Sequence, residues 1–207
     1  SEGGLGTSSK YWASAYIDTV NTATLVATTI NGIPFFADTT NNSMYTHDVS
    51  GTDNTAQHNT AYGFTAMDAI TTGDQNTAVG YGAGGALTTG SNNTLLGYRA
   101  GLNLTTGHNN VAIGGNALLN EDGDGNNVAI GTSALKDLNA GADAHNVAVG
   151  YAAGADLSTG VENTLIGGLA GDTLTTGERN TALGYNALSS EDTGSRNVAI
   201  GRGSLAV

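Results

Sequence analysis

Apolar and polar positions recur with a fixed period over residues 59–207. The pentapeptide N-[TV]-[AL]-x-G occurs nine times, with its Asn at positions 59, 76, 93, 110, 127, 146, 163, 180 and 197. Successive Asn residues are 17 positions apart, except for a spacing of 19 between Asn127 and Asn146. This regularity predicts a repeat architecture in which each unit forms one structural element of a stack.

The pentapeptide predicts a short strand that ends in a corner. Thr or Val follows the Asn, the next residue is Ala in seven units and Leu in two, and an aliphatic residue usually comes third. Because side chains alternate along a strand, the first and third residues share one face and the middle residue takes the other. We expect the small Ala face to pack against partner chains, although an Ala layer inside the coil agrees equally with the pattern.

The remainder of each unit predicts a second strand and a loop. Three residues beyond the corner Gly stands an Ala, or Ser204 in the last unit, and Thr-Thr-Gly or Ser-Thr-Gly follows later in most units. One coil would then consist of strand, corner, strand and loop. A unit of this size cannot bury its own apolar face, so we predict an all-β fold, a parallel β-roll or β-solenoid of nine coils.

The repeated Asn and Gly residues are interpreted as structural. Stacked Asn side chains can form amide ladders along the stack, and Gly allows a tight corner. The structural residues predicted in this way are Asn76, Gly80, Asn93, Gly97, Asn110, Gly114, Asn127, Gly131, Asn146, Gly150, Asn163, Gly167, Asn180, Gly184, Asn197 and Gly201.

The sequence also shows a longer period, in which features recur every four repeat units. The units that begin at Asn76, Asn93, Asn146 and Asn163 carry Ala-Gly after the corner, whereas those at 110, 127, 180 and 197 carry Ala-Leu or Ser-Leu. Leu95 and Leu165, the two middle-position Leu residues, are 70 positions apart. We infer that a block of four coils was duplicated.

Residues 1–58 lack the repeat and contain the only Trp and the only Pro of the chain. Alternating segments such as AYIDTV predict a short β-rich N-terminal element. The sequence thus divides into this element (1–58) and a solenoid domain (59–207).

Composition and charge indicate which classes of binding partner are unfavourable for this chain. Eighteen acidic and six scattered basic residues give a net charge of -12, which opposes binding to nucleic acid phosphates. No apolar run approaches the roughly 18 residues of a membrane-spanning helix, and the chain has no cysteine. We therefore expect no nucleic acid partner, no membrane insertion and no cofactor.

The repeat resembles the head domains of trimeric autotransporter adhesins, with NNVAIG (109–114 and 126–131), HNVAVG and RNVAIG as the closest copies. The present unit is longer than that family's usual coil. NTAVGYGAG and NTALGYNAL look more like related repeats in bacteriophage tail fibres, and so does the opening LGTSSKYWASAYIDTVNT, with Leu5, Gly6, Trp12 and Tyr16.

The resemblance implies a homotrimer of parallel left-handed β-rolls in a fibre of a phage-like virion. Other virion or tail proteins would join its proximal end, and a host surface glycan or protein would meet its distal part. The expected function is a rigid, non-enzymatic spacer with a receptor-binding surface. The alternative is a bacterial trimeric surface adhesin, an extracellular protein at the cell surface.

Tyr follows the corner Gly in four coils, at Tyr81, Tyr98, Tyr151 and Tyr185, and Phe64 takes this place in the first. These rings are candidates for stacking on sugar rings of a polysaccharide. Because aromatic residues also dominate interfaces between subunits, packing across a subunit boundary is the favoured interpretation.

Glu121, Asp122, Asp124 and Asn126 form the D-x-D-x-N start of a calcium loop, but the Gly and Glu expected later in such a loop are Asn127 and Ser133. Asp122, Asp124 and Asn126 are thus weak metal candidates, and a solvated loop is preferred. His47, His58, His108 and His145 are interpreted as polar loop residues, although rings of His around a trimer axis can bind metals.

Two other functions are weighed and ranked lower. A polysaccharide depolymerase would need a pair of carboxylates close together. Glu121 and Glu191 are four coils apart, which is about 19 Å along the stack. This exceeds the roughly 5–9.5 Å that separates the two carboxylates of glycosidases. An ice-binding solenoid would need a flat Thr array, which the units at Asn110, Asn127 and Asn180 interrupt.

Overall fold

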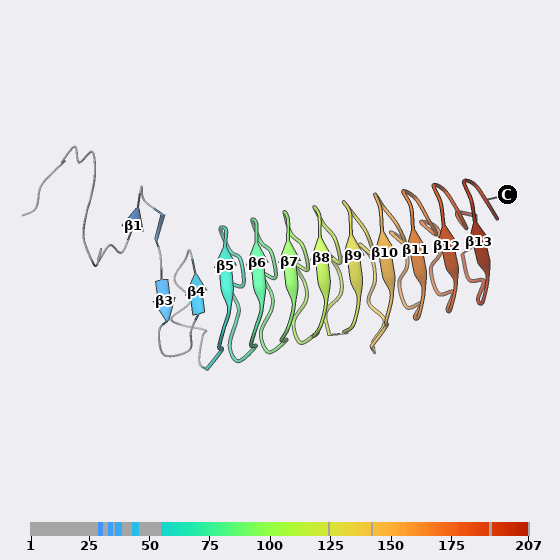
Figure 1. Ribbon diagram of the computed structural model, residues 1–207. Coiled ribbons are helices and arrows are strands. Elements are labelled where there is room, and N and C mark those ends of the chain that lie inside the picture. The colour runs from blue at the N-terminus through green and yellow to red at the C-terminus, as the bar shows by residue number, and fades with distance from the viewer. Residues whose placement is uncertain are drawn as a thin grey trace, which may run out of the picture.

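The computed structural model describes residues 29–30, 33–34, 36–38, 43–45, 55–123, 125–141, 143–190 and 192–206. Successive coils stack along one axis into a rod, and the described chain runs from one end of the rod to the other (Figure 1). The described part is all-β, and no helix in it is long and apolar enough to cross a membrane. A β-solenoid, as the sequence predicts, is confirmed.

One strand per coil builds a single long sheet. The N-terminal strands are β1 (Thr29–Ile30), β2 (Ile33–Pro34), β3 (Phe36–Asp38) and β4 (Ser43–Tyr45). The repeat strands are β5 (Thr60–Tyr62), β6 (Thr77–Val79), β7 (Thr94–Leu96), β8 (Val111–Ile113), β9 (Val128–Ile130), β10 (Val147–Val149), β11 (Thr164–Ile166), β12 (Thr181–Leu183) and β13 (Val198–Ile200).

The strands from β4 to β13 pair in parallel with their neighbours, and β3 adds to β4 in the antiparallel sense. The predicted boundary at residue 58 thus falls between two strands of one sheet. The two additional residues between Asn127 and Asn146 leave the register intact, because Val128 still pairs with Val147. The insertion is absorbed after Leu138, outside the strands.

The middle residue of every repeat strand points into the coil. Ala112 and Leu165, for example, are fully buried, and the residues on either side of them are not. The expectation that the Ala face meets partner chains is therefore wrong, and the Ala layer lies inside. The physical reason is alternation: the repeat Asn is buried, so the residue two positions later lies on the same side of the strand.

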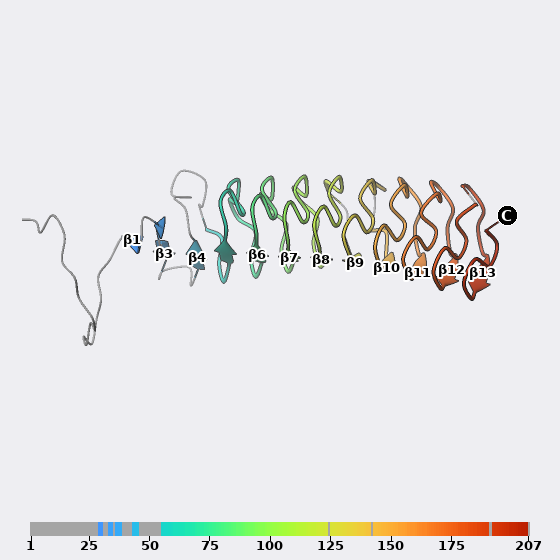
Figure 2. The same cartoon turned by 90° about the horizontal axis from the view of Figure 1, so that it is seen from above.

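The predicted second strand is also wrong within the described residues. After the corner, each coil continues through consecutive turns, which close it on the side opposite the strands (Figure 2). Two residues in this segment have positive φ, such as Asn116 (57°) and Leu118 (52°). A strand cannot contain these left-handed residues. The Ala predicted to lie in the second strand is nevertheless buried, as at Ala117.

Candidate functional site

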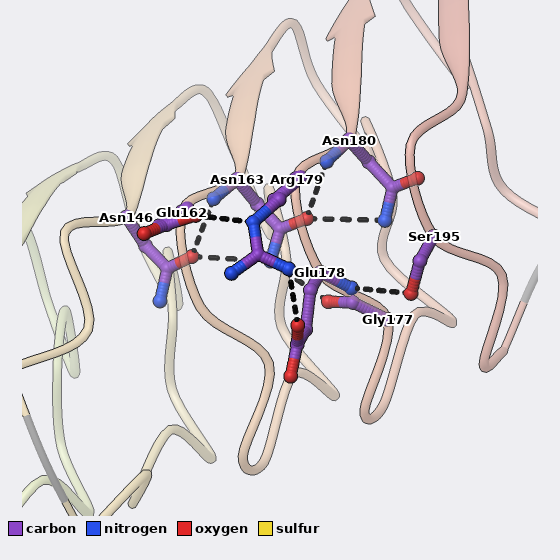
Figure 3. A network of polar contacts seen from close by, with 8 residues as sticks. All are labelled: Asn146, Glu162, Asn163, Gly177, Glu178, Arg179, Asn180 and Ser195. Carbon is purple, nitrogen blue, oxygen red and sulfur yellow. Dashed lines mark hydrogen bonds and ion pairs between the residues drawn. The ribbon is translucent and has the colours of Figure 1, made fainter.

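The repeat Asn side chains form a buried ladder through the solenoid (Figure 3). Asn163 Oδ1 accepts hydrogen bonds from the backbone N–H (2.9 Å) and from Nδ2 (3.1 Å) of Asn180. Asn163 Nδ2 donates to Asn146 Oδ1 (3.1 Å) and to the backbone oxygen of Gly177 (2.9 Å). Both donors and both lone pairs of this amide are thus used, which is why it can be buried without a large free-energy cost.

The ladder continues across the inserted residues through a backbone donor. The backbone N–H of Asn146 still donates to Asn127 Oδ1 at 3.1 Å. Asn127 Nδ2, however, donates to the backbone oxygen of Gly125, two residues before it in the chain. The expected amide ladder is therefore present and buried, and the insertion redirects one of its bonds.

Charged groups lie beside the ladder on the surface. Arg179 Nε contacts Glu162 Oε2 at 2.6 Å, and Arg179 Nη1 contacts Glu178 Oε2 at 3.0 Å (Figure 3). The backbone N–H of Glu178 donates to Ser195 Oγ on the next coil. All three charged side chains are substantially exposed, so this network contributes little to stability.

The first and third residues of the repeat strands lie on the outer side of the sheet, which we call the outer sheet face. Its third-position residues are aliphatic on eight successive strands, and none is buried: Val79, Leu96, Ile113, Ile130, Val149, Ile166, Leu183 and Ile200. The first position is Val on β8, β9 and β10, so an apolar block lies across these three neighbouring strands. Parallel sheets are normally covered on both faces, and among the described residues only the inner face of this sheet is covered.

The aromatic residues after the corner Gly lie on the surface in one column, which we call the aromatic column. The exposed fractions are 74% for Phe64, 49% for Tyr81, 50% for Tyr98, 64% for Tyr151 and 52% for Tyr185. The interior, filled by Ala and Leu, holds no aromatic side chain of the repeat coils that the structure describes. The column therefore adds exposed aromatic surface to the apolar outer sheet face.

The structure brings three of these rings together. Phe64 and Tyr81 stack with centroids 6.4 Å apart, and Tyr81 and Tyr98 stack at 5.6 Å. Arg99 lies over the Tyr98 ring at 5.0 Å. Tyr81 therefore has a ring against both of its faces, whereas Phe64 and Tyr98 each have a ring against one face. Tyr151 and Tyr185 lie further along, separated by the coil that carries Gly168 at the equivalent position.

The metal candidates are not brought into a binding site by the described residues. Asp122 is exposed and Asn126 is half-buried, and Asp124 lies outside the described residues. Within the described ranges, no three His, Asp or Glu side chains gather in a way that could hold a metal ion. His108 Nε2 lies 3.7 Å from Asp143 Oδ1, His58 and His145 lie on loops before the ladder, and His47 is outside the described residues.

Among the described carboxyl residues, Glu121 is buried and Asp172 is half-buried. Glu121 is fully buried, so it does not face a substrate; its suggested catalytic partner Glu191 lies outside the described residues. Burial raises the pKa of Asp172, backbone N–H groups of Asp172 and Thr173 oppose this in part, and the charge of Asp156 adds to it. Asp172 Oδ1 is buried without a hydrogen-bond partner among the described residues.

The Thr-Thr-Gly loops do not offer two rows of free hydroxyl groups. Thr71 Oγ1 donates to the backbone oxygen of Thr88, and Thr88 Oγ1 donates to that of Thr105. The first Thr of these loops thus binds the next coil, and only the second, such as Thr89, is exposed. This leaves a single interrupted row.

Sequence reasoning assigned the wrong strand face to the outside and so missed the aliphatic side chains of the outer sheet face. The sequence contained the information needed to assign the faces. The repeat Asn and the middle residue of the pentapeptide are two positions apart, so their side chains lie on the same face of the strand. Had the Asn been placed inside, the Val and Ile residues of NVAIG would have been assigned to the outside.

Comparisons of this chain with protein-family models, with curated proteins and with solved structures find no match.

Proposed function

We propose that this chain is a rigid segment of a surface fibre in which copies of the chain pack through the outer sheet face. The observation that carries the proposal is the aliphatic third position of eight successive repeat strands, at which no side chain is buried. Exposed apolar surface of this extent typically marks an interaction site.

The repeat favours a second copy of the chain as the partner. The outer sheet face presents equivalent residues once per coil, at the strand spacing of about 4.8 Å. A partner that covers the whole face must offer side chains at the same spacing, and another copy of the chain does so by symmetry. The resemblance of the repeats to tail fibres and adhesin heads favours three copies.

The proposed setting is a phage-like virion. Other virion or tail proteins would hold one end of the fibre, and a glycan or protein of the host surface would be its target. The second candidate is the head of a bacterial trimeric surface adhesin, which the NNVAIG copies favour. Immunogold electron microscopy with an antibody to this chain separates the two, because the label would decorate either particle tails or cell surfaces.

Sedimentation velocity combined with light scattering tests the assembly. We expect an elongated particle with the mass of three 20.6 kDa chains. Ile130→Glu places a charge on the outer sheet face of β9 without entering the coil, so it should reduce the mass to one chain while circular dichroism remains unchanged. Thr89→Glu, on the exposed loop, is the matched control and should remain trimeric. A folded monomer for the unmodified chain would overturn the proposal.

A further inference from the structure

Strand β4 ends the Asn ladder at the first repeat coil, which begins at Asn59. The backbone N–H of Asn59 donates to Ser43 Oγ at 3.0 Å, in the way that the N–H of Asn76 donates to Asn59 Oδ1. The Ser43 hydroxyl in turn donates to the backbone oxygen of Ala56 at 3.4 Å. A hydroxyl group has one hydrogen, so Ser43 has no further side-chain donor for another rung. The ladder therefore stops at β4.

Strand β4 also covers the backbone edge and the interior of the first coil. The N–H of Met44 donates to the backbone oxygen of Asn59 at 2.8 Å, which is the bond that joins successive repeat coils. Tyr45 pairs with Ala61 at the inward-facing middle position and is only 1% exposed. Its side chain is larger than the Ala or Leu at this position of the repeat coils. Tyr45 therefore covers interior surface at this end of the rod.

The sheet changes direction directly beyond β4. Strand β3 lies at the edge of the sheet and pairs with β4 in the antiparallel sense, whereas the strands from β4 to β13 are all parallel (Figure 1). Parallel and antiparallel ladders space their backbone hydrogen bonds differently. The edge that β3 presents thus differs from the edge on which each repeat coil stacks.

The opposite edge of the sheet, at β13, carries the groups of an ordinary coil. The N–H of Thr181 donates to the backbone oxygen of Asn197 on the next coil, so the equivalent N–H of Val198 points away from β12. Asn180 Oδ1 accepts from the N–H of Asn197, so Asn197 Oδ1 is the equivalent acceptor. The β13 edge thus presents one donor and one acceptor in the positions that join two coils.

The β13 edge complements the edge of the first coil that β4 covers. Asn197 Oδ1 matches the N–H of Asn59, and the N–H of Val198 matches the backbone oxygen of Asn59. Ala199 and Ala61 occupy the same inward-facing position of their coils, as Ala112 and Ala129 do on adjacent coils. Exposed strand edges with such groups are templates for pairing with another chain.

We propose that β4 is a cap that prevents the first coil of one copy from docking on the β13 coil of a second copy. The contact that β4 blocks joins two different surfaces, head to tail, and does not close on itself. Uncapped copies would therefore stack into filaments. This role differs from the proposed side-by-side packing through the outer sheet face, because the strand edge and not the strand face makes the contact.

Release of the cap in the full chain tests the proposal. Met44→Pro removes the N–H that holds β4 to Asn59, and Pro cannot replace this donor. Sedimentation velocity should then show particles with at least twice the mass of the unmodified assembly, and electron microscopy should show longer rods. Met44→Thr is the matched control, because it retains the N–H and Thr60 occupies the paired position of β5, so its mass should be unchanged.

A second substitution tests the docking edge. Val198→Pro removes the N–H of β13 that points away from β12, and Pro is tolerated at such an edge. Combined with Met44→Pro, it should restore the mass of the unmodified assembly. Each mass is compared with that of the unmodified assembly, so the result does not depend on how many copies pack side by side.

Circular dichroism establishes that each variant is folded. The proposal is overturned if folded Met44→Pro keeps the unmodified mass, or if the double variant associates as strongly as Met44→Pro. End-to-end association of the unmodified chain that Val198→Pro abolishes would also overturn it, because β4 would not be blocking the edge. If Met44→Pro does not fold, Tyr45→Glu, which places a charge at the buried position of the cap, decides by the same criteria.

Discussion

A Cβ atom at Gly154 would lie 2.7 Å from Cδ1 of Leu165. Leu165 occupies the buried middle position of β11, where most coils carry Ala, and its Cδ2 lies 2.9 Å from the place of a Cβ at Gly171. One Leu therefore fills the space that two Gly residues leave open. Leu95 has the same relationship to Gly84 and Gly101, at 2.7 and 2.9 Å. Interior volume thus explains the four-coil period.

Leu165 and Gly154 should be energetically coupled. Leu165→Ala should lower the free energy of unfolding by about 2–5 kcal/mol through the cavity it creates. Gly154→Ala should lower it by about 1–3 kcal/mol, because the methyl group collides with Leu165 and the backbone has φ +59°. In the double variant the methyl group enters the space left by Leu165, so the loss should be smaller than the sum.

Chemical denaturation of the four proteins measures this coupling. Gly141→Ala is the control for backbone strain, because its φ is +71° and a Cβ there meets nothing within 4 Å. Losses that add without coupling would contradict the packing relationship.

Removal of one internal rung of the Asn ladder should be costly. Asn163→Ala leaves Gly177 O and the backbone N–H of Asn180 without these partners in a buried place, and it removes one of the two bonds of Asn146 Oδ1 and of Asn180 Nδ2. At about 1–3 kcal/mol for each unsatisfied buried group, we expect a loss of roughly 3–5 kcal/mol in thermal or urea unfolding.

Asn197→Ala is the matched variant at the end of the ladder. Its backbone N–H still donates to Asn180 Oδ1, and its side chain is only partly buried, so the loss should be about 1 kcal/mol or less. Equal losses at both positions would show that the ladder itself contributes little.

The carboxyl group of Asp172 should make stability depend on pH. Burial raises its pKa above the ordinary value of 3.8, so the folded chain holds this proton more tightly than the unfolded chain. Its contribution to stability is therefore present at low pH and is lost as the pH rises through the raised pKa.

Asp172→Asn should accordingly raise the melting temperature at neutral pH, and the gain should shrink as the pH falls toward about 4. Melting curves of both proteins across this range measure the effect. Asp156→Asn should have a smaller effect, because the charge of Asp156 is a lesser cause than burial. A gain that is independent of pH would contradict this account.

Gln75 precedes a ladder Asn with φ +59° and has an exposed side chain. A side chain in the left-handed region costs about 1–2 kcal/mol, and Gly avoids this at some entropic cost. Gln75→Gly should therefore stabilise the chain by up to about 1 kcal/mol, whereas the β-branched Gln75→Val should destabilise it. Thermal unfolding of the two variants measures the difference, and an opposite order would show that side-chain contacts outweigh backbone strain here.

The sequence predicted some structural elements of each coil correctly and one of them incorrectly. The strand, the corner Gly and the Asn ladder follow from residues that recur in every coil, because each copy of a repeat meets the same neighbours. The segment after the corner, where Leu118 and Asn116 have positive φ, was mistaken for a strand. The apolar pattern of this segment does not predict left-handed turns. Non-Gly residues adopt a left-handed conformation only when hydrogen bonds between coils compensate for its steric cost.

The candidate site shows the same division. The spacing of the Tyr residues predicted an aromatic column, and Phe64, Tyr81 and Tyr98 do stack. That the Tyr185 ring lies against Gly168, 3.5 and 3.8 Å from the place of a Cβ atom, depends on ring orientation, which the spacing alone does not specify.

The amino-acid sequence by itself determined the repeat length, the number of coils and the β-strand of each coil, because these depend on local alternation and on Gly and Asn at regular intervals. Only the tertiary structure decided which strand face is inside. That choice depends on a buried amide that must find four hydrogen bonds, three of them with Asn residues of adjacent coils, and on Leu and Gly volumes that match across coils. With Asn and Ala inside, Val and Ile are left on the outer sheet face.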